Sequence, residues 1–242
     1  MNGSTARASG LRIYFPIAVL ALVIAIVGFW ATYYGPLLAG NATTPVVIQV
    51  HAAVFVGWIS LLMAQARLAA KHRLALHIKL GRYAMLYGAL LVTMGVVATF
   101  VAFRTHLRSG NLQRAEMILF VGLTDILTFA PFLAAAWWYR TRPEMHKRLI
   151  VVATTILLVA PAHRMHWFLG GPPAPVAYVL LIWLAPIYLA MIHDFVTRRI
   201  VHPVYLIGIL AVMYMKFWRS DLFRSPAWHA FSDWLKNSLR VI

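Results

Sequence analysis

Four polar side chains lie inside long apolar segments, where an ionisable group without a partner is costly. His51 and Asp125 each interrupt one such segment, and His163 and His166 lie near the end of a third. Imidazole nitrogens and carboxylate oxygens can bind a metal ion, orient a ligand or carry a proton, so ionisable residues at this depth are functional candidates. His163 and His166 are three residues apart, which places them on one face of a helix. We expect all four side chains to form one metal-binding or cofactor-binding site.

Arg164 lies between the two histidines and is expected to act as a supporting residue next to this site. A carboxylate such as Asp125 could orient a ligating imidazole or neutralise Arg164. The alternative is a structural one, in which the polar side chains only join neighbouring helices through ion pairs or hydrogen bonds.

A second polar group is expected at the opposite face of the membrane. Its members are His77, His146, Arg148, His193 and Asp194. Basic residues at the cytoplasmic ends of helices bind anionic lipid headgroups, which accounts for most of this group. The same imidazoles could instead hold a second redox centre.

The elements that must position these residues are membrane helices. The chain of 242 residues is 62% hydrophobic and only 12% charged, and its mean hydropathy is +0.76. Such a composition is typical of a protein that crosses a membrane several times. Seven apolar segments approach the roughly 20 residues that a bilayer requires, and they predict an all-α bundle. The predicted spans are 13–34, 46–66, 83–103, 117–138, 149–168, 176–196 and 201–218.

Two segments flank this predicted transmembrane domain of residues 13–218. Residues 1–12 form a polar tail that carries Arg7 and Arg12. Residues 219–242 contain Ser225-Pro226, a typical helix start, followed by apolar residues at helical spacing. The pattern predicts an amphipathic helix in the membrane interface, or alternatively a helix that docks on a partner subunit. The apolar residues of this stripe are Trp228, Phe231, Trp234, Leu235 and Leu239.

The formal net charge of +16 arises from 22 Lys and Arg against 6 Asp and Glu. Most basic residues lie between apolar segments, where they set membrane orientation and contact anionic lipid headgroups. Their distribution predicts a cytoplasmic N-terminus and an outer C-terminus in a bacterial inner membrane. No basic face or base-stacking module accompanies the charge, so nucleic acid is not an expected partner. The chain has no cysteine, which excludes disulfides, thiolate nucleophiles and iron–sulfur clusters.

A short repeat precedes two of the predicted spans. Residues 73–80 and residues 142–149 both read R-x-x-x-H-x-[KR]-L, and Arg198-x-x-x-His202 is a weaker third copy. An internal duplication of helix pairs produces such a pattern.

At these positions the chain resembles a family of bacterial multi-pass membrane proteins that carry a domain of unknown function. The resemblance runs from Val46 to Trp167 and rests on His51, HIKLGR (77–82), HKRLI (146–150) and Arg164. The chain differs from the family pattern at Ile78, where a basic residue is usual, and at Ile150, where Met is usual. The resemblance implies the multi-span architecture and this set of positions, but no activity.

These residues favour a membrane redox or metal-site protein. Histidines facing the bundle would hold haem b or a non-haem metal ion, transfer electrons and act on a quinone or another lipophilic partner. A structural or accessory subunit of a larger membrane complex is the alternative, and a transporter or lipid-modifying enzyme is the third hypothesis. The sequence leaves open whether the protein is an enzyme.

Overall fold

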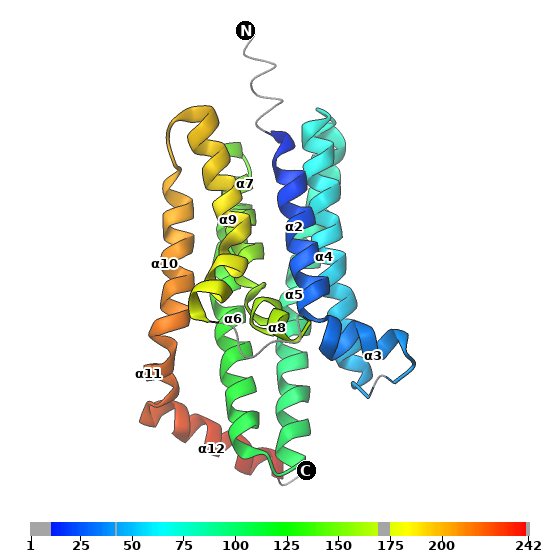
Figure 1. Cartoon of the computed structure of the whole chain (residues 1–242), viewed down its shortest axis with the longest axis vertical. Coiled ribbons are helices and arrows are strands. Elements are labelled where there is room, and N and C mark those ends of the chain that lie inside the picture. The colour runs from blue at the N-terminus through cyan, green and yellow to red at the C-terminus, as the bar shows by residue number, and fades with distance from the viewer. Residues whose placement is uncertain (1–10, 42, 169–174, 241–242) are drawn as a thin grey trace.

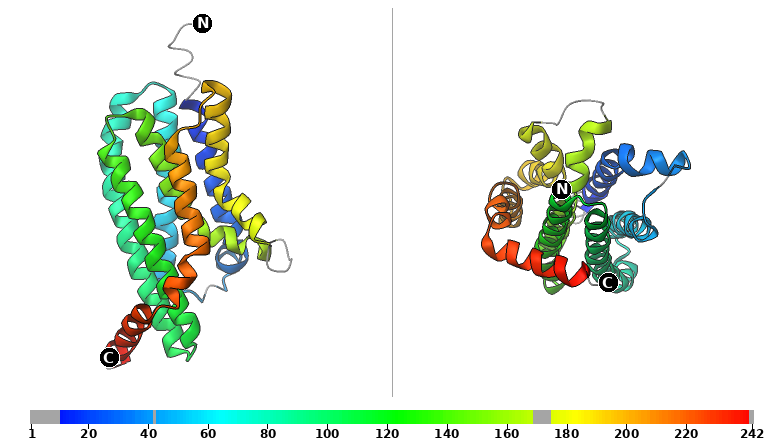
Figure 2. Two further views of the ribbon diagram at one scale, coloured as in Figure 1. Left: turned by 90° about the vertical axis from the view of Figure 1, so that its left-hand side faces the viewer. Right: turned by 90° about the horizontal axis from the view of Figure 1, so that it is seen from below.

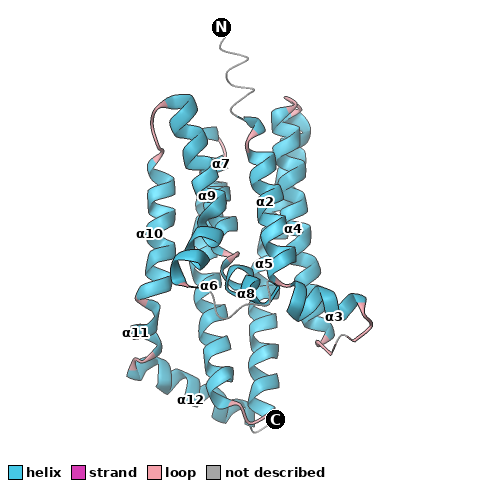
Figure 3. Cartoon of the chain, viewed as in Figure 1, coloured by secondary structure: helices cyan, strands magenta, loops and turns pink. Residues whose placement is uncertain are grey.

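A computed structural model describes residues 11–240 apart from 42 and 169–174. The predicted all-α class is confirmed, because 87% of the chain is helical and the described residues contain no strand. Long helices run up and down the bundle (Figure 1; Figure 3), with α2 starting at one end and α12 lying at the other. The first ten residues of the predicted tail and the predicted break at 170–173 lie outside the described residues. The elements are α2 (Tyr14–Gly28), the π-helical turn η1 (Trp30–Tyr34), α3 (Gly35–Leu38), α4 (Val46–Ala70), α5 (Leu74–Arg108), α6 (Leu112–Trp138), α7 (Pro143–Ile156), α8 (Val159–Phe168), α9 (Val176–Arg198), α10 (Pro203–Phe217), α11 (Arg219–Phe223) and α12 (Pro226–Arg240).

Several helices are long and apolar enough to cross a membrane. Within the described residues, α4, α5, α6 and α9 meet this description on their own. Two more spans are possible if each bent pair is counted as one: α2 with η1 and α3, and α7 with α8. The helix α10 has only 15 residues. The structure thus supports four to six spans of a membrane protein, and the predicted count of seven is not confirmed.

The predicted span over 149–168, which Pro161 interrupts in the sequence, consists of two helices in the structure. The chain bends by 50° between α7 and α8, just before Pro161. Proline has no backbone N–H to continue the helix, and its ring clashes with the carbonyl group four residues earlier, at Leu157. Proline is tolerated in the first turn of a new helix, where α8 places it. Helix α8 then packs closely against α2 at Gly28. Only glycine fits at this position, because a Cβ atom there would be 2.2 Å from the Pro161 carbonyl oxygen.

The main hydrophobic core is formed by residues of α2 and of α4 to α10. Its largest fully buried side chains include Trp58, Trp183 and Phe129. The Trp58 indole N–H donates to Thr154 Oγ1 across 3.3 Å, which joins α4 to α7. This core holds the upper part of the bundle together, while the far ends of α5 and α6 extend beyond it (Figure 1).

A second, smaller hydrophobic cluster joins α12 to those extended ends. Leu235 of α12 packs with Phe103 of α5 and with Ala115 and Leu119 of α6. Figure 2 shows α12 lying across the end of the bundle when the molecule is viewed from below. The predicted N-cap is present, since the backbone N–H of Trp228 donates to Ser225 Oγ across 3.2 Å. The apolar stripe is divided, because Leu235 is buried whereas the Trp234 side chain is 62% exposed.

Candidate functional site

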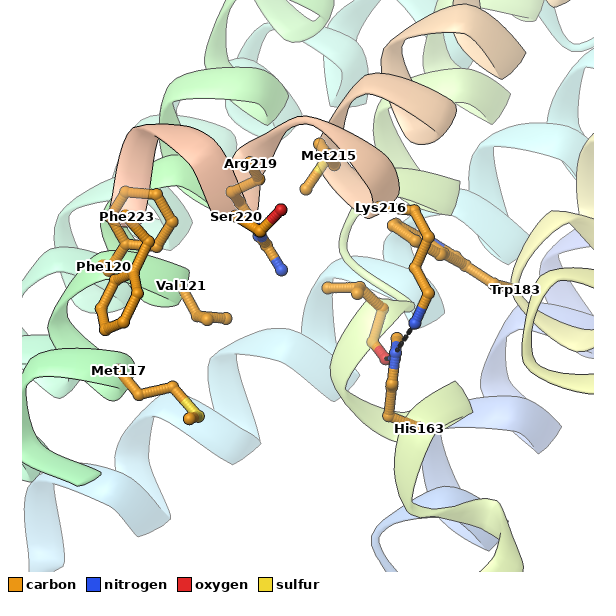
Figure 4. Close-up of a pocket in the computed structure, with 11 residues that line it drawn as sticks. Met117, Phe120, Val121, His163, Trp183, Met215, Lys216, Arg219, Ser220 and Phe223 are labelled. Atoms are coloured by element: carbon orange, nitrogen blue, oxygen red, sulfur yellow. Dashed lines mark hydrogen bonds between the residues drawn. The ribbon is translucent and has the colours of Figure 1, made fainter. Parts of the chain in front are cut away.

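A pocket of about 200 Å³ lies where α6, α8, α9, α10 and α11 meet. Four of its lining residues are polar: His163 from α8, Lys216 from α10, and Arg219 and Ser220 from α11. Figure 4 shows Lys216 and His163 meeting on one side, Arg219 pointing in from α11, and Phe120 and Phe223 on the opposite side. The pocket therefore combines a cationic side with an apolar one.

Hydrogen bonds define the protonation of His163. Its Nδ1 lies 2.8 Å from the Val159 carbonyl oxygen, so Nδ1 carries the proton and donates it there. Its Nε2 lies 3.1 Å from Lys216 Nζ and accepts a hydrogen bond from that ammonium group. The imidazole is therefore neutral, and both of its nitrogens are occupied.

Arg219 is paired with Asp125. Its Nη1 lies 2.5 Å from Asp125 Oδ1 and also donates to Thr124 Oγ1 across 3.2 Å. Asp125 thus has a cationic partner, but this partner is Arg219 at the start of α11 and not the expected Arg164. The ion pair joins the middle of α6 to the end of α10, which positions one wall of the pocket.

Lys216 has no carboxylate partner among the residues that the structure describes. It shares its hydrogen bond with a neutral imidazole instead. Two cations, Lys216 and Arg219, and one anion, Asp125, leave the pocket with a net charge of +1. A half-buried ammonium group without a counter-ion is electrostatically unfavourable, and a bound anion would relieve this cost.

The opposite wall is aromatic and apolar. Phe120 packs edge-on against Phe223 with 5.1 Å between ring centroids, and against Trp228 with 4.7 Å. Trp183 lies on the other side, next to His163 and Lys216 (Figure 4), with 6.2 Å between the His163 and Trp183 ring centroids. Met117 lies at the outer rim and is 49% exposed. The rim of the pocket at Met117 is therefore apolar and partly exposed.

The other residues predicted for this site lie outside the pocket. The half-buried His51 has a buried Nδ1 without a hydrogen-bond partner among the described residues. His166 donates from Nδ1 to the His163 carbonyl oxygen across 2.9 Å. Arg164 donates to the Ala160 carbonyl oxygen and stacks over Phe29, with 5.2 Å to the ring centroid. Of the predicted set, only His163 and, through Arg219, Asp125 reach the pocket.

Within the described residues, no three His, Asp or Glu side chains lie close enough together to hold a metal ion. His163 is the predicted ligand that lines the pocket, and each of its ring nitrogens lies within hydrogen-bond distance of a neighbouring group.

The second predicted group contains the most deeply buried charges of the protein. Arg148 and Asp194 are 1% and 2% exposed, and two guanidinium nitrogens approach Asp194 Oδ2 at 2.8 and 2.6 Å. Arg148 also bonds Glu144 Oε2 at 2.7 Å. Glu144 in turn bonds Arg198 at 2.5 Å and Lys147 at 2.9 Å. This ion network joins α7 to α9 and lies at the end of the bundle opposite to α12.

The two histidines of the sequence repeat make the same contact. His77 Nδ1 lies 3.3 Å from the Gln65 carbonyl oxygen of α4, and His146 Nδ1 lies 2.8 Å from the Ala136 carbonyl oxygen of α6. Each imidazole thus joins the start of one helix to the end of the helix before it. His193 differs, since its Nδ1 is 4.0 Å from Asp194 and makes no hydrogen bond among the described residues.

The sequence interpretation missed Lys216 and Arg219 as site residues. Both lie at the end of a predicted span, where basic residues are ordinarily assigned to headgroup contacts. Asp125 could have indicated Arg219 as its partner. A carboxylate inside a span requires a cation, and Arg219 lies at the same predicted membrane face.

Comparison of the chain with protein-family models, curated proteins and solved structures found no match. Function is therefore argued from the geometry of the pocket.

Proposed function

We propose that this chain is an integral membrane protein that binds the anionic headgroup of a lipid in the pocket between α6, α8, α10 and α11. Its acyl chains would lie along the apolar outer surface of the bundle. The ligand is a phospholipid with a net negative headgroup, held by Lys216 and oriented by the neutral imidazole of His163.

The unpaired charge of Lys216 is the observation that carries this proposal. A lysine that only supports the fold is expected to pair with a carboxylate or to extend into water. Lys216 instead projects toward a pocket with aromatic walls and donates to His163 across 3.1 Å. An ammonium group readily binds phosphate oxygens as a point charge. The apolar lining of the pocket favours a phosphate that belongs to a lipid over a free inorganic anion.

The size of the pocket agrees with a headgroup site. About 200 Å³ accommodates a phosphate with a small alcohol, but not two acyl chains. The chains require an apolar exit, which the half-exposed Met117 provides at the rim. Helix α10, which forms another side of the pocket, carries exposed apolar side chains at Leu206, Leu210 and Tyr214.

The same exposed face supports a seventh membrane crossing by α10. A continuous apolar surface on one helix is stable in contact with lipid and unfavourable in water. Helix α10 has 15 residues, and α11 extends it toward α12. Seven crossings place α2 and α12 on opposite sides, with the N-terminus cytoplasmic by the charge rule. The pocket would then lie at the outer headgroup level of a bacterial inner membrane.

A binding experiment on the purified protein in a neutral detergent tests the proposal. Lys216→Gln should weaken the binding of a short-chain phosphatidylglycerol about tenfold or more, as expected for losing a charge-assisted hydrogen bond. Arg224→Gln is the matched control, because Arg224 is an exposed cation of the same segment outside the pocket. This control should bind like the parent protein.

Short-chain phosphatidylcholine and a short-chain ubiquinone distinguish the ligand classes. Both should bind weakly to the parent protein, and Lys216→Gln should leave their binding unchanged. Equal affinity for phosphatidylglycerol and phosphatidylcholine would contradict a site for an anionic headgroup. Tight ubiquinone binding would favour the quinone hypothesis instead.

A further inference from the structure

One wall of the pocket belongs to a segment that is attached separately from the main core. Helix α11 contributes Arg219, Ser220 and Phe223 to the lining. It connects α10 to α12, and α12 is held by the smaller cluster around Leu235, not by the main core. The position of this pocket wall therefore depends on the docking of α12 as well as on the Arg219–Asp125 ion pair.

The docking of α12 combines an ion pair with imperfect packing. Lys236 of α12 forms an ion pair with Glu116 of α6 and a second one with Asp233 of its own helix at 2.7 Å. Burial disfavours the charge of Lys236, but its bonds to the two carboxylates outweigh this and raise its pKa. Two buried polar atoms, Trp228 Nε1 and Ser232 Oγ, have no hydrogen-bond partner among the described residues. Unpaired buried polar groups weaken an interface.

The membrane surface offers α12 an alternative apolar environment. Phe231 and Trp234 lie on the flank of α12 that does not face α6, and their rings pack 6.1 Å apart. Aromatic side chains of an amphipathic helix are stable at the lipid headgroup level. The helix is therefore held between two surfaces, the ends of α5 and α6 on one side and the interface on the other.

We propose that α11 and α12 form a lid on the headgroup pocket, with the Lys236–Glu116 ion pair as its latch. When α12 leaves α6 and remains on the membrane surface, α11 swings away with Ser220 and Phe223, and the pocket opens toward the headgroup layer. The lid rests on the proposed function only in that the pocket has a ligand to admit.

Because the native chain has no cysteine, a single introduced thiol in the pocket reports the opening directly. Val121 lines the pocket on the α6 side (Figure 4), so Val121→Cys with a water-soluble maleimide serves as the probe. Adding Glu116→Gln breaks the latch and should raise the labelling rate about threefold, as expected for the loss of one partly exposed ion pair. Asp233→Asn is the matched control, because it removes the other carboxylate partner of Lys236 without disconnecting α12 from α6.

A variant with the opposite expected effect separates lid opening from a general loss of stability. Ser232→Ala removes a buried hydroxyl group without a partner among the described residues, so it should hold the lid closed and slow the labelling of the introduced thiol about threefold. Equal labelling rates in the latch variant, the control and the Ser232→Ala variant would overturn the lid. So would faster labelling with Asp233→Asn than with Glu116→Gln.

The labelling needs no lipid, so it is independent of the ligand proposal. Rates that change as expected, together with phosphatidylglycerol binding that does not depend on Lys216, would support the lid and refute the headgroup site. Unchanged rates with Lys216-dependent binding would support the site and refute the lid.

Discussion

The two ends of the bundle differ in whether their charged side chains are paired with charges of opposite sign. At one end, Arg148 and Asp194 are almost completely buried, and each charge faces a partner of opposite sign. At the other end, Arg219 pairs with Asp125, but among the described residues Lys216 pairs only with a neutral imidazole. The first arrangement is complete within the chain, whereas the second leaves one positive charge that a ligand can neutralise.

The contrast between the two ends indicates that a buried charge is not by itself evidence of a ligand-binding site. A buried ion pair that is fully satisfied has no capacity left for a ligand, so it acts as a connection between helices. An incompletely satisfied cation in an open pocket keeps that capacity. The deeper charges are therefore assigned to stability, whereas the shallower ones are those to which the proposed function assigns ligand binding.

The largest expected effect on stability comes from breaking the buried Arg148–Asp194 ion pair. Asp194→Asn leaves the Arg148 guanidinium buried with reduced compensation, which should lower the free energy of unfolding by about 3–5 kcal/mol. Thermal unfolding of the purified protein in detergent measures this change. Phosphatidylglycerol binding by the protein that remains folded should be unaffected, because the pocket lies at the other end.

The double variant Arg148→Met with Asp194→Leu sharpens the same comparison. Removing both charges removes the desolvation cost together with the attraction, so most of the lost stability should return. If the double variant is as unstable as Asp194→Asn, the ion network stabilises the fold more than an uncharged pair of apolar side chains does.

An intermediate effect is expected at the unsatisfied end. Asp125→Asn removes the counter-ion of Arg219, which is partly exposed, and should lower the free energy of unfolding by only about 1 kcal/mol. The same change raises the net charge of the pocket from +1 to +2. Phosphatidylglycerol should then bind about tenfold more tightly, because Arg219 gains the freedom to donate to the phosphate. Isothermal titration calorimetry measures the affinity, and thermal unfolding measures the stability. Weaker binding by Asp125→Asn would contradict the expected hydrogen bond from Arg219 to the phosphate.

Much of the fold follows from the sequence. The apolar segments correspond to α4, α5, α6 and α9, because a helix is the arrangement that satisfies every backbone group within such a run. The N-cap at Ser225 identified the start of α12, since a hydroxyl at that position satisfies a backbone N–H. The sequence predicts interruptions at Pro131, Pro161 and Pro186 alike, but only the helix at Pro161 breaks, whereas Pro131 and Pro186 remain inside continuous helices. Proline alone does not decide between a kink and a break, and the packing of α8 against Gly28 is a tertiary feature.

The pocket was harder to predict than the helices. His163 and Asp125 were selected from their position in apolar segments, but the residues that they contact, Lys216 and Arg219, are distant in the sequence. Pairing between α8 and α10, or between α6 and α11, depends on how the helices pack, and helical spacing within one segment carries no information about it. His51 and His163 could not be separated by residue type alone, although only one of them reaches the pocket.

The smallest expected effects concern the histidines of the sequence repeat. His77→Ala and His146→Ala each remove one hydrogen bond from an imidazole to a backbone carbonyl group, so each should lower the free energy of unfolding by about 1 kcal/mol. Because the two contacts connect different helix pairs, α4 with α5 and α6 with α7, the double variant should lose the sum of the two effects. Lipid binding should not change in any of the three variants. A much larger loss for His146→Ala than for His77→Ala would mean that the His146 contact also supports the neighbouring Arg148 network, and the two copies of the repeat would then differ in role. A change in phosphatidylglycerol affinity would contradict the separation between the two ends of the bundle, since neither imidazole lines the pocket.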